Sequence, residues 1–164
     1  MGGWDVATLK IIGVGEVAKY HDLDSYDSVV RYIQRQDKTV PRFCGGIAVN
    51  PAQAALEMQI LTKAYRQEEG SCLRHMVLSF TPREIDDMGH ANGLAFEIAE
   101  YYGGSYQITW AVHGDKRHIH IHFIMNKVSY LNGKKYHGTK KDYYDFINHT
   151  KTVLWQLGIP VQVG

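Results

Sequence analysis

The stretch that decides the fold is residues 106–128, YQITWAVHGDKRHIHIHFIMNKV. Two runs of β-branched and aromatic residues, 106–113 and 119–128, are separated by a short polar link that contains glycine, which is the pattern of a β-hairpin. Residues alternate between the two faces of a strand, so His120 and His122 share one face, opposite Ile121 and Phe123. One face of the hairpin is therefore expected to join an apolar core, while the other presents imidazoles.

Outward from the hairpin, strands and helices are interspersed. Further strands are predicted at 9–14, 46–49 and 75–81, where short apolar runs are rich in β-branched residues. Helices are predicted where apolar residues repeat at helical spacing next to capping signals: at 23–36, at 50–67, from the capping-box pattern Thr81-Pro82-Arg83-Glu84 to Gly103, and at 143–157. These elements predict an α+β domain with an antiparallel or mixed central sheet and helices on one of its faces.

Length and composition narrow the class of protein. The 164 residues suit one domain with one core, and 45% hydrophobic with 21% charged residues exclude disorder and coiled coil. No apolar run approaches the ~18 residues that cross a bilayer, so no membrane insertion is expected. The two cysteines, Cys44 and Cys72, have no paired spacing and predict reduced thiols in a cytoplasmic protein. The net charge of +1 does not indicate a nucleic-acid partner, which has to be inferred from a site.

The candidate site is a cluster of histidines. Four of the nine histidines lie within ten residues: His113, His118, His120 and His122. The hairpin folds His113 back beside His120 and His122, and three imidazoles on one sheet face form a metal site that leaves positions open for water or substrate. Asp115 is placed to accept a hydrogen bond from one of these rings and orient it. The alternative interpretation is that these are surface histidines on a solvated strand. It is disfavoured because three of the histidines are expected on the same face of the sheet.

The same spacing allows a second class of metal protein. Residues Gly114, His120, His122, Asn126 and Gly133 resemble the first cupin motif, with asparagine in place of glutamate. Cupins are all-β jelly rolls, whereas four helices are predicted here, and the second cupin motif is missing downstream. A cupin-like enzyme acting on a small molecule is therefore the minor alternative.

The wider pattern resembles a family of nucleases. The motif His113-x-Asp115-x-x-His118-x-His120-x-His122-x-x-x-Asn126 is similar to the three-histidine motif of relaxases, the mobilisation nucleases of conjugative plasmids and integrative elements, particularly the MOBP class. Tyr32-Ile33 followed by Lys38-Thr39 resembles the family's segment with the nucleophilic tyrosine, and His75-x-x-x-Ser79-Phe80-x-Pro82-x-Glu84 resembles its middle motif. The resemblance covers roughly residues 9–160. Val112 and Ile121 stand where many relatives have threonine and asparagine. Neither position is an expected metal ligand, so these departures bear on the assignment to a subfamily more than on the chemistry.

The resemblance implies a fold, a reaction and partners. The fold is that of the HUH endonucleases, an antiparallel sheet holding the histidines, with helices behind it. The reaction is metal-dependent nicking and rejoining of single-stranded DNA at a transfer origin through a 5′-phosphotyrosine intermediate. The implied metal is Mg²⁺ or Mn²⁺, and three imidazoles also suit Mn²⁺, Ni²⁺ or Zn²⁺. The implied partners are the origin DNA, accessory mobilisation proteins and a coupling protein, and residues 1–164 are expected to be the N-terminal nuclease domain of a longer protein.

Carried over residue by residue, the resemblance assigns His113, His120 and His122 as metal ligands and Asp115 as the orienting residue. His118 and His75 are further candidates for the metal or the substrate, and Asn126 has no derived role. Tyr32 is the preferred nucleophile, ahead of Tyr26 and Tyr20, which requires its helix to lie over the histidine face. Contacts to DNA are expected from the basic residues Arg31, Arg35, Lys38, Lys134, Lys135, Lys140 and Lys141. A non-catalytic module that binds single-stranded DNA is the remaining alternative.

Overall fold

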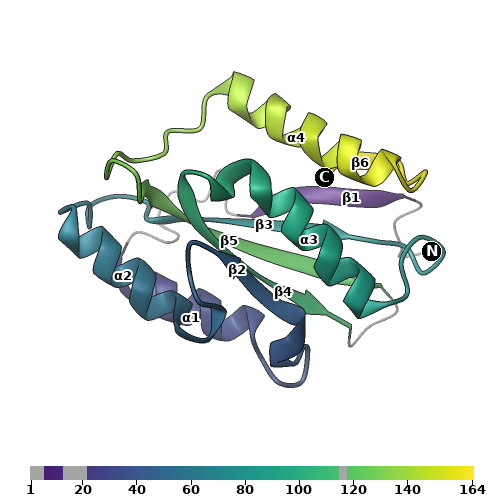
Figure 1. Ribbon diagram of the computed structural model, residues 1–164, viewed down its shortest axis with the longest axis horizontal. Helices are drawn as coiled ribbons and strands as arrows, with labels where there is room; N and C mark the ends of the chain where they lie inside the picture. The colour runs from purple at the N-terminus through teal and green to yellow at the C-terminus, as the bar shows by residue number, and fades with distance from the viewer. Residues whose placement is uncertain (1–5, 13–21, 115–117) are drawn as a thin grey trace.

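The computed structural model describes residues 6–12, 22–114 and 118–164. In this part of the chain one six-stranded sheet forms the middle of the molecule, in the order β2-β4-β5-β3-β1-β6 (Figure 1). The strands are β1 (Ala7–Ile12), β2 (Cys44–Ile47), β3 (Leu73–Ser79), β4 (Tyr106–His113), β5 (His120–Ser129) and β6 (Val161–Val163). All neighbouring strands are antiparallel except β1 and β6, which are parallel. The fold is therefore α+β with a mixed sheet.

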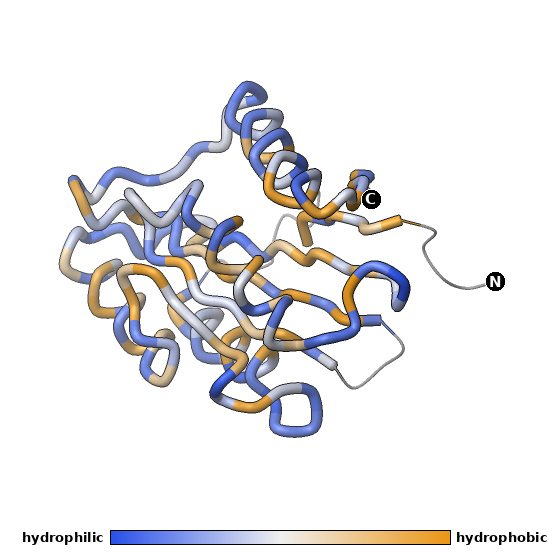
Figure 2. Tube along the Cα trace, turned by 45° about the vertical axis from the view of Figure 1, so that its right-hand side comes forward, coloured by the Kyte–Doolittle hydropathy of each residue, from blue (hydrophilic) through white to orange (hydrophobic). Residues whose placement is uncertain are grey.

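Helices cover both faces of this sheet, so the expectation of helices on one face was wrong. Helices α3 (Met88–Gly103) and α4 (Lys140–Trp155) close the larger core, while α1 (Asp24–Ile33) and α2 (Ala54–Ala64) close a second, smaller one. The reason lies in the central strands, which are hydrophobic over much of their length (Figure 2) and have buried residues on both faces. Leu73, Ala111 and Ile124 face α1 and α2, and strands buried on both faces need cover on both.

The register of the central strands confirms the predicted alternation. On β5, His120 lies opposite His113 of β4 and opposite Ser79 of β3. His122, two residues on, lies opposite Ala111 of β4 and Val77 of β3. Ile121 and Phe123, which alternate with these histidines on β5, belong to the larger core under α3 and α4. The histidines therefore occupy the face of the sheet on which α1 and α2 lie.

Other elements depart from the sequence prediction. Helix α3 begins at Met88, not at Pro82: Glu84 does accept the Thr81 backbone N–H at 2.9 Å, but the Asp87 side chain caps the helix by accepting from Gly89 N at 2.8 Å. Strand β6 and two short 3-10 helices, Pro41–Phe43 and Pro51–Gln53, were not predicted separately. The four helices contradict the jelly roll of a cupin. No helix of the described ranges is long and apolar enough to cross a membrane.

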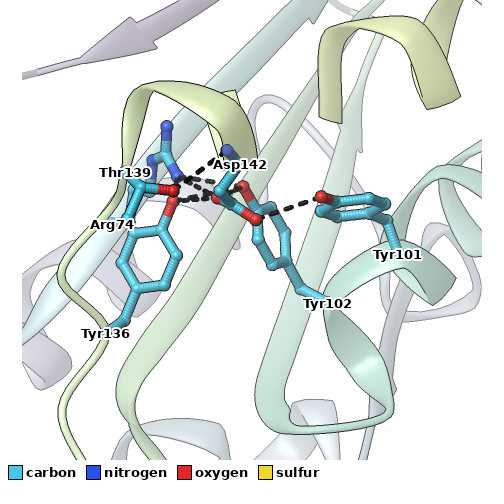
Figure 3. A network of polar contacts seen from close by, with 6 residues as sticks. All are labelled: Arg74, Tyr101, Tyr102, Tyr136, Thr139 and Asp142. Atoms are coloured by element: carbon cyan, nitrogen blue, oxygen red, sulfur yellow. Dashed lines mark hydrogen bonds and ion pairs between the residues drawn. The ribbon is translucent and has the colours of Figure 1, made fainter. Parts of the chain in front are cut away.

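Helix α4 is attached to the sheet by a polar network that includes Arg74 of β3 (Figure 3). Asp142, in the first turn of α4, accepts hydrogen bonds from the hydroxyls of Tyr101 (3.0 Å), Tyr102 (2.8 Å) and Tyr136. Arg74 of β3 donates to the Tyr102 hydroxyl at 3.0 Å and also to that of Tyr136. The segment between β5 and α4 is thereby tied to the body of the fold.

Candidate functional site

Four histidine rings gather where β3, β4 and β5 lie side by side. His122 is in the middle of this histidine cluster, with its ring centroid 4.2 Å from that of His113, 5.2 Å from His75 and 6.5 Å from His120. His75, His113 and His122 are buried, and His120 is half-buried. The structure thus brings together the three predicted metal ligands and adds His75 from β3.

Each of these rings is held by a neighbouring group. The Nε2–H of His113 donates to the carbonyl oxygen of Ile33, the last residue of α1, at 2.7 Å. His120 Nδ1 lies 3.1 Å from Ser79 Oγ, and His122 Nδ1 lies 3.0 Å from His75 Nε2. A neutral imidazole has one N–H and one lone pair, so donation from Nε2 leaves the lone pair of His113 on Nδ1. Such contacts set the orientation and tautomer of a ring, as they do for histidines that bind metals.

Burial sets the charge of the central ring. Desolvation and the neighbouring imidazoles His113, His75 and His120 lower the pKa of His122 to about 2. The ring is therefore neutral at physiological pH. Neutral imidazole is the form that binds metal ions.

The donor set fits a transition-metal ion by its chemistry. Within residues 6–12, 22–114 and 118–164, no group of three or more His, Cys, Asp or Glu side chains is already arranged to hold a metal. The cluster nevertheless offers several imidazoles on one face, of which the central one is neutral, and nitrogen ligands of this kind suit Mn²⁺, Ni²⁺ and Zn²⁺. His113, His120 and His122, the ligands expected from the sequence, all belong to this cluster.

One further motif histidine lies next to this cluster. His118 Nδ1 lies 3.1 Å from the carbonyl oxygen of Phe80, and its ring centroid is 6.5 Å from that of His120. His118 is therefore as close to His120 as His122 is, and it extends the row of imidazoles past His120. Asp115 lies outside the described residues.

Helix α1 brings one tyrosine to the histidines. Tyr32 is 48% exposed, and its ring stands edge-on to that of His122 with a centroid distance of 6.0 Å. Tyr26, by contrast, is fully buried, and its hydroxyl bonds to Asn126 Oδ1 (2.8 Å), the Cys72 carbonyl (2.9 Å) and Thr62 Oγ1 (2.8 Å). Burial also raises the pKa of Tyr26. Of the two, only Tyr32 is accessible and next to the histidines; Tyr20 lies outside the described residues.

Asn126, a motif residue without a predicted role, joins β5 to the helices on the histidine face. Besides accepting from Tyr26, its Oδ1 accepts from Val128 N at 3.0 Å, and its Nδ2 donates to Gln107 Oε1 at 3.0 Å. The side chain is completely buried. A polar residue on the inner face of a buried strand must be hydrogen-bonded, so its position in the alternation was the signal for a structural role.

A groove that the sequence did not indicate opens beside the histidines. It has a volume of about 530 Å³ and lies between α1 and the strands β1 and β3. Tyr32, His75 and His122 line one part of it. The other lining residues are Ile12, Asp22, Asp24, Ser25, Ser28, Val29 and Val77. The groove is thus continuous with the histidine cluster.

The predicted DNA-binding residues fall into two separate regions. Arg31 and Arg35 flank Tyr32 in sequence and pair with Asp27 and Asp37, both at 2.7 Å. The Lys38 carbonyl accepts from Gly114 N at 3.1 Å, which places this segment beside the start of the hairpin link.

The second region is remote from the histidines. Lys134 and Lys135 lie beside Ser129 and Val128 at the other end of β5, about 30 Å from His120 at ~3.4 Å per residue. Lys135 Nζ donates to the carbonyl of Gln67 at 2.9 Å, and Lys141 pairs with Asp145 at 2.6 Å. Lys134 and Lys140 are exposed, with Lys140 in the first turn of α4. The structure does not bring this basic segment to the cluster.

Comparison with known proteins gives a consistent result. Residues 32–158 match a family model described as relaxase, MobA/VirD2-like, nuclease domain. Two proteins named Protein rlx from Staphylococcus aureus are 35% and 30% identical over 77 and 98 residues, which are 47% and 58% of this chain but 24% and 29% of those proteins. The group II intron-interrupted relaxase LtrB of Lactococcus lactis subsp. cremoris is 34% identical over 38% of this chain and 11% of its own length. The chain thus spans less than a third of these curated relatives.

Proposed function

The chain belongs to the relaxase family, with a MobA/VirD2-like nuclease domain, and on this premise we propose that it nicks and rejoins one strand of DNA at a transfer origin. The observation that supports this proposal is the position of Tyr32, exposed and edge-on to His122 at the mouth of the groove. The same arrangement unites the tyrosine motif and the histidine motif, which are about ninety residues apart in sequence. Residues 1–164 act as the nuclease domain in this proposal.

A divalent metal would be held by His113, His120 and His122. When bound, it would supply Lewis-acid stabilisation of the charge that develops on the phosphate oxygens. His75 contacts His122 and orients it, and Asp115 has the same role toward its neighbouring histidines. Mn²⁺ or Mg²⁺ is the ion expected in function.

Tyr32 is the nucleophile of the proposed reaction. Its phenolic oxygen attacks phosphorus as the phenolic proton is lost, a bond from phosphorus to that oxygen forms, and the bond from phosphorus to the 3′ oxygen breaks. The 3′ oxygen takes up a proton and leaves as a hydroxyl, while the 5′ phosphate stays on the tyrosine. Because a phenoxide is a good leaving group, attack by a 3′ hydroxyl reverses the step and rejoins the strand.

Single-stranded origin DNA is the proposed substrate. Arg31, Arg35 and Lys38 lie within six residues of Tyr32, and their charges suit the phosphates on either side of the one that reacts. Accessory mobilisation proteins and a coupling protein are the proposed protein partners.

Covalent attachment of DNA tests this function. The protein is incubated with Mn²⁺ and a labelled single-stranded oligonucleotide carrying the transfer origin of the element that encodes it. We expect a DNA-shifted band on a denaturing gel, lost in Tyr32→Phe, which removes one oxygen and keeps the ring. Tyr144→Phe is the matched control and should still form the adduct, because Tyr144 is an exposed tyrosine of α4, away from the histidine cluster.

The result distinguishes the remaining alternatives. An adduct that persists in Tyr32→Phe but disappears in Tyr26→Phe or Tyr20→Phe would show that the nucleophile is Tyr26 or Tyr20 and not Tyr32. DNA binding without an adduct in the wild-type protein would contradict the enzyme and favour a non-catalytic module.

A further inference from the structure

The groove beside the histidine cluster has a lining that suits a base rather than a phosphate. Its volume of about 530 Å³ is within the ~300–1,000 Å³ range of ligand pockets. Ile12 and Val77 of the sheet and Val29 of α1 supply an apolar surface, against which the flat face of a base can pack. The described lining residues include two carboxylates, Asp22 and Asp24, which favour a hydrogen-bond donor over an anion.

One carboxylate in this lining has no partner among the described residues. Asp22 Oδ1 accepts from the backbone N–H and the hydroxyl of Ser25, at 3.1 and 3.2 Å. The Asp24 side chain, two residues on, is exposed and makes no hydrogen bond or ion pair with any residue that the structure describes. Asp24 is therefore a carboxylate in the groove with both oxygens open to a ligand.

The groove also has a defined relation to the reacting phosphate. Tyr32, His75 and His122 line it, so a strand whose phosphate lies at the histidines has a neighbouring nucleotide at the groove. Lys10 of β1, exposed and opposite Val77 in the register, lies on the same face of the sheet. Its charge favours a backbone that passes outside the groove while the base points in.

We propose that the groove binds one unpaired base next to the scissile phosphate, and that Asp24 selects a base with an exocyclic amino group. A carboxylate accepts hydrogen bonds from amino groups such as N4 of cytosine or N6 of adenine, whereas thymine would turn carbonyl oxygens toward it. The inference rests on the proposed function, because the histidines and Tyr32 define where the strand crosses the sheet.

Selection from random sequences tests this inference whatever the sequence of the transfer origin. The Tyr32→Phe protein, which retains the ring but cannot be consumed by cleavage, is incubated with Mn²⁺ and a randomised single-stranded DNA library, and the bound fraction is sequenced. We expect one position at which thymine is depleted about tenfold, as for other hydrogen-bonded base contacts.

Adding Asp24→Asn should abolish this depletion, because an amide presents a donor as well as an acceptor. Asp27→Asn is the matched control: it removes the same charge from the first turn of α1, but Asp27 pairs with Arg31 and does not line the groove. With Asp27→Asn the depletion should remain. Thymine accepted equally at every selected position, or a depletion that survives Asp24→Asn, would overturn the base site.

The adduct assay separates this inference from the proposed function. Selected sequences are incubated with the protein that retains Tyr32. Adduct formation without an Asp24-dependent preference keeps the nicking function and removes the base site. An Asp24-dependent preference without any adduct keeps the base site and removes the nicking function.

Discussion

His122 makes contacts with three other imidazoles and with the ring of Tyr32. Its own Nδ1 is engaged with His75, while His113 and His120 are held by the Ile33 carbonyl and by Ser79. The orientation of each ring is therefore set by the protein itself. A metal ion that binds such pre-oriented ligands does not have to order them, so less free energy of binding is lost to side-chain entropy.

At the residue scale, His120→Ala should abolish Mn²⁺ binding. One of three nitrogen ligands is lost, whereas the fold should persist because His120 is only half-buried at the start of β5. Titration calorimetry measures the binding and circular dichroism the fold. His149→Ala is the control and should retain binding, since His149 lies on α4 beside Glu97, away from the histidine cluster. Undiminished Mn²⁺ binding in His120→Ala would remove His120 from the ligand set.

His75 is expected to act through His122. When His122 Nδ1 donates to His75, the lone pair of His122 is on Nε2 and can face a metal. His75→Leu removes this acceptor and should weaken Mn²⁺ affinity by ~10–100-fold. His75→Glu supplies a carboxylate acceptor instead and should restore much of the affinity. Calorimetry that finds equal affinity in the leucine variant and the wild-type protein would show that His75 does not orient the ligand.

At the scale of elements, α1 is tied to the sheet at both of its ends. Near its start, the Tyr26 hydroxyl bonds to Asn126, and Cys72 Sγ lies 3.3 Å from the Asp22 carbonyl. At its end, the Ile33 carbonyl accepts from His113. Tyr32, one residue earlier, is therefore held beside His122 in the absence of DNA. A buried hydroxyl with several partners also explains why Tyr26 serves the fold.

Helix α4 depends on a different kind of attachment, the tyrosines around Asp142 (Figure 3). Burial and the nearby carboxylate raise the pKa of Tyr101 to about 12, and burial also raises the pKa values of Tyr102 and Tyr136. Above about pH 10 the unfolded chain loses these phenolic protons while the folded protein keeps them. The folded state then holds more protons, so the free energy of unfolding should fall as the pH rises.

Chemical denaturation between about pH 8 and about pH 11, around the ordinary tyrosine pKa, checks this expectation. Tyr102→Phe removes one of the raised groups and should make the fall with pH shallower. Tyr144→Phe, which alters an exposed tyrosine of the same helix, should leave the slope as it is. A slope that is the same in Tyr102→Phe and in the wild-type protein would show that the network does not couple folding to phenol ionisation.

At the scale of the whole molecule, the two faces of the sheet have different tasks. One face is buried under α3 and α4 in the larger core, and the other bears the histidines, Tyr32 and the groove. The basic segment 134–141 begins beside Ser129 at the opposite end of β5, about 30 Å from His120. This basic segment can contact DNA bound at the histidines only if the DNA strand runs along the length of the sheet.

Binding of long and short oligonucleotides at several salt concentrations therefore tests the segment. Replacing Lys134 and Lys140 by glutamine should reduce the dependence of log K on log[salt] by ~1.4 for a long single strand, at ~0.7 per phosphate contact. An oligonucleotide too short to reach both regions should bind with an unchanged slope. Lys151→Gln, which alters another exposed residue of α4, is the control. If the double variant and the wild-type protein bind the long oligonucleotide with the same salt dependence, the bound DNA does not contact Lys134 or Lys140.

The sequence by itself determined the hairpin, the faces of its residues and the family motifs. These follow from local geometry, because a strand repeats every two residues and a helix every 3.6. The sequence left Tyr32, Tyr26 and Tyr20 as candidate nucleophiles, and only the structure shows that Tyr26 is buried while Tyr32 is exposed beside His122. The start of α3 was misplaced because a capping pattern at Thr81 competes with a second cap at Asp87.

Only the tertiary structure decided which of these residues meet. The contacts of His75 with His122, of His113 with Ile33 and of Tyr26 with Asn126 join residues 47, 80 and 100 positions apart. The groove, the cover on both faces of the sheet and the distance of the basic segment from the histidines arise in the same way. Local periodicity states which face a side chain occupies, but the order of the strands and the docking of α1 determine what lies opposite it, and these depend on burying all the apolar faces at once.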